Sequence, residues 1–176
     1  PEWELAALFQ GQVLQHTSNK LAIEYYHNYL NSNPKAKDVR LSYARLLVVE
    51  KDYPQARSEF QRLRKDFPNN AEVALAVGLL SMQLNDFDAA EASFKQALSQ
   101  NYKDRDSVRY YLGQVYEERK RYDEALRWYS SVAQGEQYFP AQLRYANVLA
   151  KQGKLAEARK HLSQVAVQDN QQRIQI

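Results

Sequence analysis

The sequence has no cysteine, few residues that break helices and no long apolar run. Five glycines and five prolines among 176 residues argue against long irregular loops. The missing cysteine excludes disulfides, thiolate metal ligands and cysteine nucleophiles. The longest apolar run, around Val73–Leu80, is far shorter than the roughly 20 residues that a membrane-spanning helix needs.

A dominant charge and a catalytic signature are also lacking. The chain carries 24 Lys and Arg against 21 Asp and Glu, a net charge of +3, which does not by itself favour nucleic acid. No H-E-x-x-H, G-x-S-x-G or glycine-rich phosphate loop occurs. Acidic pairs such as Glu117 and Glu118 are adjacent and diverge on a helix, and the three histidines stand far apart, at His16, His27 and His161. We therefore expect neither an enzyme, nor a cofactor, nor a metal site.

What the sequence does contain is a pattern that repeats about every 34 residues. Alanines recur at Ala22, Ala56, Ala90, Ala125 and Ala158. A large apolar residue stands four positions after each, at Tyr26, Phe60, Phe94, Tyr129 and Leu162. The residue twelve positions before each of these alanines is small in the last four repeats but not in the first. The series is Gln10, Ala44, Gly78, Gly113 and Ala146. Five repeats therefore fill the chain, at residues 3–36, 37–70, 71–105, 106–138 and 139–172.

Each repeat contains two apolar patterns at helical spacing. In the second repeat they are Leu41, Ala44 and Val48, then Ala56 and Phe60. Small residues let two helices approach closely, and large residues one turn away fill the space beside the contact. The pattern predicts an antiparallel helix pair in every repeat.

These residues resemble the tetratricopeptide repeat, and the fourth repeat carries the pattern best, with Leu112, Gly113, Tyr116, Ala125 and Tyr129. The resemblance covers roughly 170 of the 176 residues. It implies an all-α fold, a single domain over 1–176 of ten helices in five antiparallel pairs, stacked into a right-handed superhelical solenoid. The repeats depart from the family pattern at Gln10, where a small residue is expected, and where proline is replaced by Tyr102, Gln137 and Asn170.

The resemblance also implies a concave groove lined by the first helix of each repeat. Its rows are Leu41, Leu75, Tyr110 and Leu143, then Arg45, Leu79, Gln114 and Asn147, then Val48, Met82 and Glu117. Some family members clamp a carboxylate tail with Lys, Asn and Arg, but the matching positions Ala7, Gly11, Ser42, Glu72 and Ala76 lack those residue types. The groove is apolar in the first three repeats and more polar toward the fifth, which favours an amphipathic helix or an extended apolar peptide as ligand.

The leading hypothesis is a non-catalytic scaffold or adaptor that binds a protein segment in this groove. The alternative is a structural spacer or self-association module of a larger repeat protein, and an RNA-binding helical repeat is a remote alternative. The N-terminus is apolar, with Trp3, Leu5 and Phe9, and a polar tail runs from Gln168 to Ile176. We expect a segment of a longer repeat protein that self-associates through its ends or groove, and the composition favours no compartment.

Overall fold

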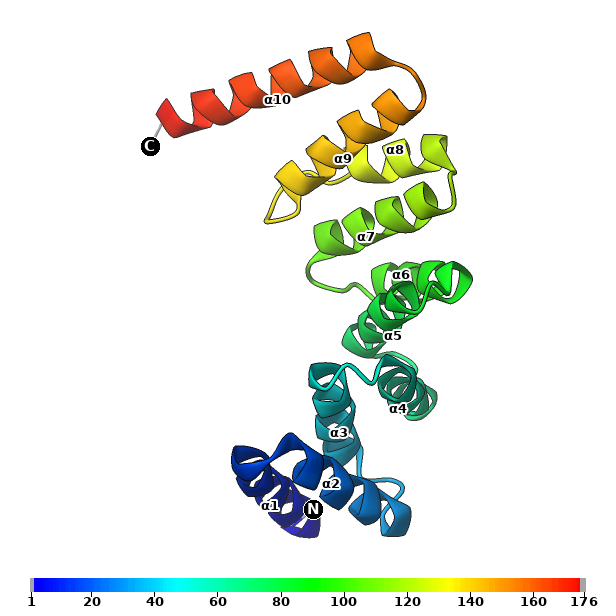
Figure 1. Cartoon of the computed structure of the whole chain (residues 1–176), viewed down its shortest axis with the longest axis vertical. Coiled ribbons are helices and arrows are strands. Elements are labelled where there is room, and N and C mark those ends of the chain that lie inside the picture. The colour runs from blue at the N-terminus through cyan, green and yellow to red at the C-terminus, as the bar shows by residue number, and fades with distance from the viewer. Residues whose placement is uncertain (1, 175–176) are drawn as a thin grey trace. The chain divides into compact units, whose positions relative to one another are not determined.

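All regular secondary structure in the described part of the chain is helical. The computed structural model describes the backbone of residues 2–174 and the side chains of residues 3–165. Its helices are α1 (Glu2–Thr17), α2 (Asn19–Ser32), α3 (Lys37–Val49), α4 (Tyr53–Asp66), α5 (Ala71–Gln83), α6 (Phe87–Ser99), α7 (Arg105–Glu118), α8 (Tyr122–Ser130), α9 (Tyr138–Lys151) and α10 (Leu155–Ile174). They form one pair in each predicted repeat (Figure 1). The prediction of an all-α helical-repeat fold is confirmed.

The last helix differs from the sequence expectation. The polar segment from Gln168 was expected to be a tail, but α10 continues to Ile174, and residues 175–176 lie outside the described residues.

The helices fall into two compact units, residues 1–100 with α1–α6 and residues 101–176 with α7–α10. In the first unit each helix packs against the next, and α1 also contacts α3. In the second unit the packed pairs are α7 with α8, α8 with α9, α7 with α9, and α9 with α10. Each helix thus contacts near neighbours in the chain, as in repeat proteins. The single domain over 1–176 stays a prediction.

Side-chain caps define where several helices begin. Asp52, Asn70, Asp86 and Asp104 each accept a hydrogen bond from a backbone N–H in the first turn of the following helix. Such a cap contributes about 1 kcal/mol to helix stability. In α3 the N-terminus is capped from another helix, because the Glu4 carboxylate of α1 accepts from Asp38 N at 2.8 Å. This bond joins the first helices of two successive repeats.

Glycine against an aromatic ring is the contact that closes three of the helix pairs. A Cβ added to Gly113 would lie 2.4 Å from Cε1 of Tyr129, and one added to Gly78 would lie 2.5 Å from Cε1 of Phe94. In the first pair the same contact is made by Gly11, whose added Cβ would meet the ring of Tyr26.

The assignment of Gln10 as the closely packed position of the first repeat is therefore wrong. Gln10 is exposed and Gly11 is buried. The reason is the connection between the helices: Ser18 alone separates α1 from α2, whereas three residues separate the helices of the later pairs. The shorter turn shifts the register of α1 by one residue, so the first repeat keeps its small residue.

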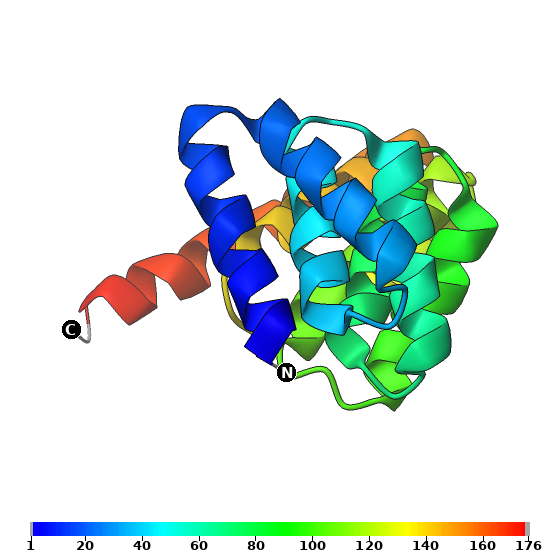
Figure 2. The ribbon, with the colours of Figure 1, turned by 90° about the horizontal axis from the view of Figure 1, so that it is seen from below.

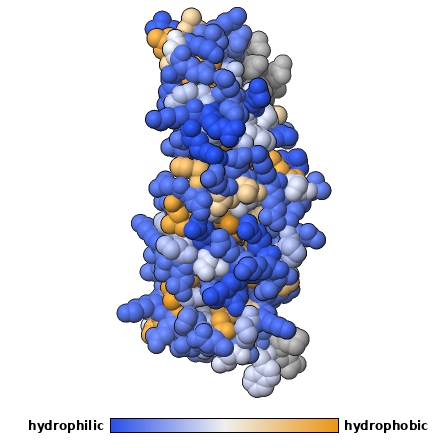
Figure 3. All heavy atoms as spheres, turned by 90° about the vertical axis from the view of Figure 1, so that its right-hand side faces the viewer, coloured by the Kyte–Doolittle hydropathy of each residue, from blue (hydrophilic) through white to orange (hydrophobic). Residues whose placement is uncertain are grey.

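Apolar side chains fill the space between the helices of each unit. In the first unit the core includes Val39, Tyr43, Phe60 and Val77, all no more than 5% exposed. One buried ion pair crosses it, between Arg40 of α3 and Glu59 of α4. Hydrophilic residues cover most of the face drawn in Figure 3, where the apolar patches are small.

Candidate binding groove

A pocket of about 380 Å³ lies in the first unit between α3, α4 and α5. Its walls come from three helices, with Arg45 and Val48 from α3, Tyr53 and Phe60 from α4, and Ala76, Leu79, Leu80 and Gln83 from α5. Val48 and Leu79 are each 36% exposed, so they are accessible from solvent, while Phe60 and Leu80 are 5% exposed and form the floor. A pocket of this size and composition is within the range that takes a few apolar side chains of a ligand.

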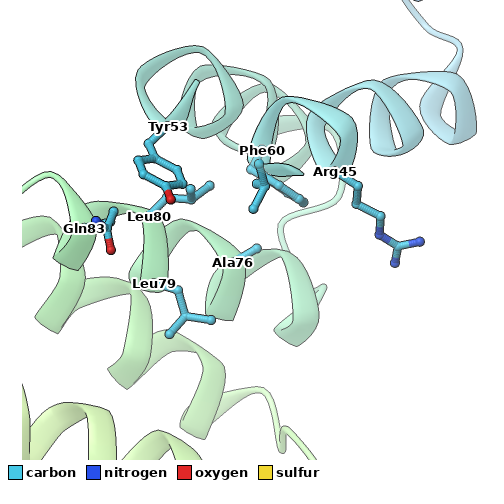
Figure 4. A pocket seen from close by; sticks show the side chains of 8 residues that line it. Arg45, Tyr53, Phe60, Ala76, Leu79, Leu80 and Gln83 are labelled. Atoms are coloured by element: carbon cyan, nitrogen blue, oxygen red, sulfur yellow. The ribbon is translucent and has the colours of Figure 1, made fainter. Parts of the chain in front are cut away.

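The positions of the lining residues follow from the helical repeat. Val48 stands one turn after Arg45, and Leu79 and Gln83 stand one turn apart on α5, so each helix presents one stripe to the pocket. Figure 4 shows Tyr53 and Phe60 facing α5 from α4, and the Arg45 guanidinium extending away from these two rings. Of the lining residues only Arg45 is charged, and no described residue pairs with it. The pocket is thus an apolar cleft with one unpaired cation at its edge.

Three residues predicted for the groove, Arg45, Val48 and Leu79, come together in this pocket. Of the other predicted residues in this unit, Leu41 is half-buried against the core, and Leu75 and Met82 are half-buried. Two positions considered in the first repeat, Ala7 and Gly11, are buried, in keeping with the one-residue register shift.

Sequence reasoning missed Tyr53, Phe60, Leu80 and Gln83 as pocket residues, and it considered Ala76 only as a position where some family members clamp a carboxylate. Phe60 recurs in the repeat and was interpreted as a packing position alone, and Tyr53 was assigned no place in the groove. Their rings reach the pocket because they lie on α4, and α4 packs against both α3 and α5, the two first helices that form the other walls. The repeat pattern identifies such positions, but it does not say which of them stay partly uncovered.

In the second unit three of the predicted groove residues, Tyr110, Gln114 and Glu117, make polar contacts within the chain. Glu117 of α7 is 4% exposed, and its carboxylate accepts hydrogen bonds from Lys151 Nζ at 2.7 Å, Tyr129 Oη at 2.7 Å and Arg144 Nη1 at 3.3 Å. Gln114 donates to the Tyr110 hydroxyl at 3.1 Å. Leu143 and Asn147 of α9 are exposed. Glu117 is therefore fully engaged within the chain.

Two cations that sequence reasoning missed surround this carboxylate. The side chains of Arg144 and Lys151 are 38% and 43% exposed, whereas that of Glu117 is 1% exposed. The cluster carries one negative and two positive charges, and both positive groups reach solvent. Arg144 and Lys151 occupy the repeat positions of Ala76 and Gln83, so the slots that are apolar or neutral in the first unit are cationic in the second.

The protonation states of the network follow from its contacts. Burial alone would raise the pKa of Glu117, but hydrogen bonds from Lys151 and Tyr129 and the charge of Arg144 outweigh it and hold this pKa below the ordinary 4.5. The hydrogen bond to Glu117 raises the pKa of Lys151. Burial, and then the adjacent carboxylate, raise the pKa of the Tyr129 phenol far above its ordinary value. At neutral pH the network is a carboxylate, two cations and a neutral phenol.

Neither a metal centre nor a membrane span emerges in the described part of the chain. Among its residues, no three histidine or acidic side chains are grouped as metal ligands. No helix within the same range combines the length and the apolar character needed to cross a bilayer.

Comparison with known proteins agrees with the helical-repeat fold. Sequence models of the tetratricopeptide repeat match residues 14–80, 75–139 and 140–169. A comparison with functionally characterised proteins finds no match.

Several solved structures share the fold at low sequence identity. A MamA crystal structure aligns with a TM-score of 0.80 and 18% identity over 91% of this chain and 88% of its own. A MamA structure from Desulfovibrio magneticus RS-1, residue 41 to the end, gives 0.82 and 14% over 98% of both chains. YrrB, described as a repeat protein with an unusual peptide-binding site, gives 0.73 and 18% over 87% of this chain and 79% of its own. With the repeat matched from residue 14 to residue 169 and helix pairs in every repeat, this chain belongs to the tetratricopeptide repeat family.

Proposed function

We propose that this chain is a non-catalytic interaction scaffold that binds an apolar segment of a partner protein in the pocket between α3, α4 and α5. The observation that supports the proposal is the partly uncovered pair Val48 and Leu79 above the floor of Phe60 and Leu80. Apolar side chains held open on rigid helices are suited to the anchor residues of a peptide or helix. The peptide-binding site named for the related fold of YrrB is consistent with this role.

The positive charge of Arg45 at the pocket edge favours a ligand that carries a negative charge beside its apolar residues. Arg45 is exposed, no described residue pairs with it, and no acidic residue lines the pocket. An acidic side chain next to an apolar anchor would place its carboxylate by the guanidinium, whose planar donors suit it. The proposed ligand is therefore an apolar segment flanked by Asp or Glu.

A displayed library of random peptides, selected on the immobilised chain, tests this proposal. We expect enriched peptides that carry a large apolar residue near an acidic one. Leu79→Asp should weaken their binding at least about tenfold, because it places a charge where an apolar anchor sits. Since Leu79 is partly exposed, the same change should cost no more than about 1 kcal/mol of folding stability.

Two further variants separate the groove from other surfaces. Leu21→Asp, on α2 at 44% exposure, makes the same substitution away from the pocket and should leave binding unchanged. Arg45→Glu should weaken the acidic peptides selectively and reduce the dependence of their affinity on salt. Equal loss of binding in Leu79→Asp and Leu21→Asp would show that the pocket is not the binding site. Unfolding of Leu79→Asp in thermal melts would show that Leu79 is a core residue and not an accessible wall of the pocket.

A further inference from the structure

Two first helices of the first unit, α3 and α5, are held apart at the pocket. In the same unit α1 packs against α3 (Figure 2), and in the second unit α7 packs against α9. Among the described residues, however, no Cα atom of α3 lies within 8 Å of a Cα atom of α5. Both helices pack instead on α4, whose Phe60 forms part of the pocket floor. The pocket is therefore a gap between two helices whose counterparts in the α1–α3 and α7–α9 pairs are in contact.

The second unit shows how side chains can join two first helices. There the Glu117 carboxylate of α7 accepts hydrogen bonds from Arg144 and Lys151 of α9. In the first unit the repeat position of Glu117 is taken by Val48, and the positions of the two cations are taken by neutral side chains. No hydrogen bond or ion pair joins α3 to α5 among the described residues. A ligand that contacts both helices would take the place of this bridge.

The groups that line the pocket favour a ligand whose backbone needs no partner. All three walls are helices, whose backbone N–H and C=O groups bond within the helix itself. Among the described lining residues, the groups that can both donate and accept are the Tyr53 hydroxyl and the Gln83 amide. An extended peptide carries a free N–H and C=O at almost every residue, and burial of such groups without partners costs free energy. A helix forms these bonds internally, so it fits the gap with the fewest unpaired groups.

We propose that the gap between α3 and α5 takes an amphipathic α-helix of a partner protein, with apolar residues on Val48 and Leu79 and an acidic residue beside Arg45. The proposal rests on the proposed function, because it concerns the same pocket, and it selects a helix over an extended segment as the ligand. Residues three or four apart share one face of a helix, so two apolar anchors enter the pocket together. Since Val48 stands one turn after Arg45, a carboxylate one turn from an anchor on the ligand can reach the guanidinium.

Three labelled synthetic peptides of about 16 residues, long enough to form a helix, test the conformation of the ligand. The first has leucines three and four positions apart and a glutamate one turn from the nearest leucine. The second has the same residues reordered so that leucines alternate with polar residues, as on one face of a strand. The third is the first peptide with proline in place of a central alanine on its polar face. In fluorescence anisotropy titrations the first should bind at least about tenfold more tightly than the other two, because a central proline breaks a helix.

Matched controls separate helix formation and the gap from other effects. Proline placed in the first turn of the first peptide should change its affinity by less than about twofold, because a helix tolerates proline there. Val48→Asp on α3 and Leu79→Asp on α5 should each weaken the first peptide at least about tenfold, whereas Leu21→Asp on α2 should not. The combined change Val48→Glu, Ala76→Arg and Gln83→Lys copies the bridge of the second unit. It should also remove binding, and it replaces Val48→Asp if that variant fails to fold.

The other outcomes overturn the proposal in distinguishable ways. Equal binding of the first two peptides, removed in both cases by Leu79→Asp, would mean that the pocket takes an extended segment; the proposed function then stands and the helix does not. Loss of binding in Leu79→Asp but not in Val48→Asp would mean that the ligand rests on α5 without bridging the gap. If none of the three peptides binds, the gap takes no acidic amphipathic helix, while selection from random peptides still decides the proposed function.

Discussion

Single residues set how closely the two helices of a pair can approach. Tyr129 is fully buried, and its ring fills the space that a side chain on Gly113 would need. The same relation holds between Gly78 and Phe94. A glycine in a helix lowers helix stability by about 1 kcal/mol relative to alanine, so its presence here is explained by the ring rather than by local preference.

Gly113→Ala should therefore destabilise the protein although alanine is the better helix former. A ring with no free space around it cannot move away, and overpacking of this kind costs about 1–3 kcal/mol. Thermal melts should show a lower Tm for Gly113→Ala, and Glu118→Ala, at the exposed end of the same helix, should show little change. An unchanged or higher Tm for Gly113→Ala would mean that Tyr129 can move aside.

Glu117 makes stability depend on pH in a direction that its contacts determine. Its pKa in the folded chain lies below the ordinary 4.5, so its contribution is present at neutral pH and is lost as the pH falls below about 4.5 and through the folded value. Glu117→Gln should be less stable at pH 7 by about 1–3 kcal/mol, because the amide has no charge and replaces one of the two acceptor oxygens of the buried network by an NH₂ donor. The gap between the two proteins should narrow toward pH 3 in urea titrations. Glu118→Gln is the control, and a constant gap over this range would contradict the assignment.

The sequence identifies residues whose place is fixed by the repeat spacing, and it does not identify residues whose place depends on a turn length or on another helix. Gly113, Ala125 and Tyr129 were recognisable because close packing demands a fixed spacing in every repeat. Gly11 was misassigned because its place depends on the length of one turn, which the alanine series does not record. Arg144 and Lys151 were missed because their position depends on a carboxylate of another helix, Glu117.

At the scale of elements, the turn inside each repeat after the first ends the first helix with a left-handed residue. Lys51, Asn85, Lys120 and Gly153 all have positive φ, between 57° and 79°. The next residue donates back to a carbonyl in the last turn, as in the bond from Arg121 N to Tyr116 O at 2.8 Å. This geometry closes a helix end efficiently but favours glycine or asparagine. The two lysines occupy it at a conformational cost.

Lys120→Gly should raise stability for this reason. A residue with a Cβ in the left-handed region costs about 1–2 kcal/mol, which exceeds the entropy that glycine loses on folding. We expect a gain of up to about 1 kcal/mol in urea unfolding. Lys120→Ala removes the same side chain but keeps the Cβ, and should not be stabilised. If the alanine variant gains as much as the glycine variant, the lysine side chain and not the backbone is responsible.

The repeat pattern predicted some of the pocket residues but not others. The stripe of first-helix positions predicted Arg45, Val48 and Leu79 together, because one residue per turn of each helix faces the same side. It did not predict that Phe60 and Leu80 would form a floor beneath them, because residues at those positions serve as packing in most repeats. Whether such a position also borders a cleft depends on the size of its neighbours.

At the scale of the whole molecule, the contacts link each helix to its neighbours in the chain. Among the described residues of the first unit α1 contacts α2 and α3, and in the second unit α7 contacts α8 and α9. The free energy of unfolding of such a protein is close to the sum of the stabilities of the single repeats and of the interfaces between neighbouring repeats. A local defect should therefore loosen its own neighbourhood first and distant repeats least.

Hydrogen exchange followed by mass spectrometry can measure this distribution of stability. Gly113→Ala should speed amide exchange most in α7, α8 and α9, because these helices share the overpacked contact or touch it. Gly11→Ala makes the reciprocal change, since its Cβ would meet the ring of Tyr26, and it should speed exchange in α1, α2 and α3 while leaving α9 and α10 close to the unmodified chain. Both variants change the same residue type at the same structural position, so differences between them report location alone. Uniformly faster exchange in both variants would mean that the chain unfolds as one cooperative block, and the nearest-neighbour description would then be wrong.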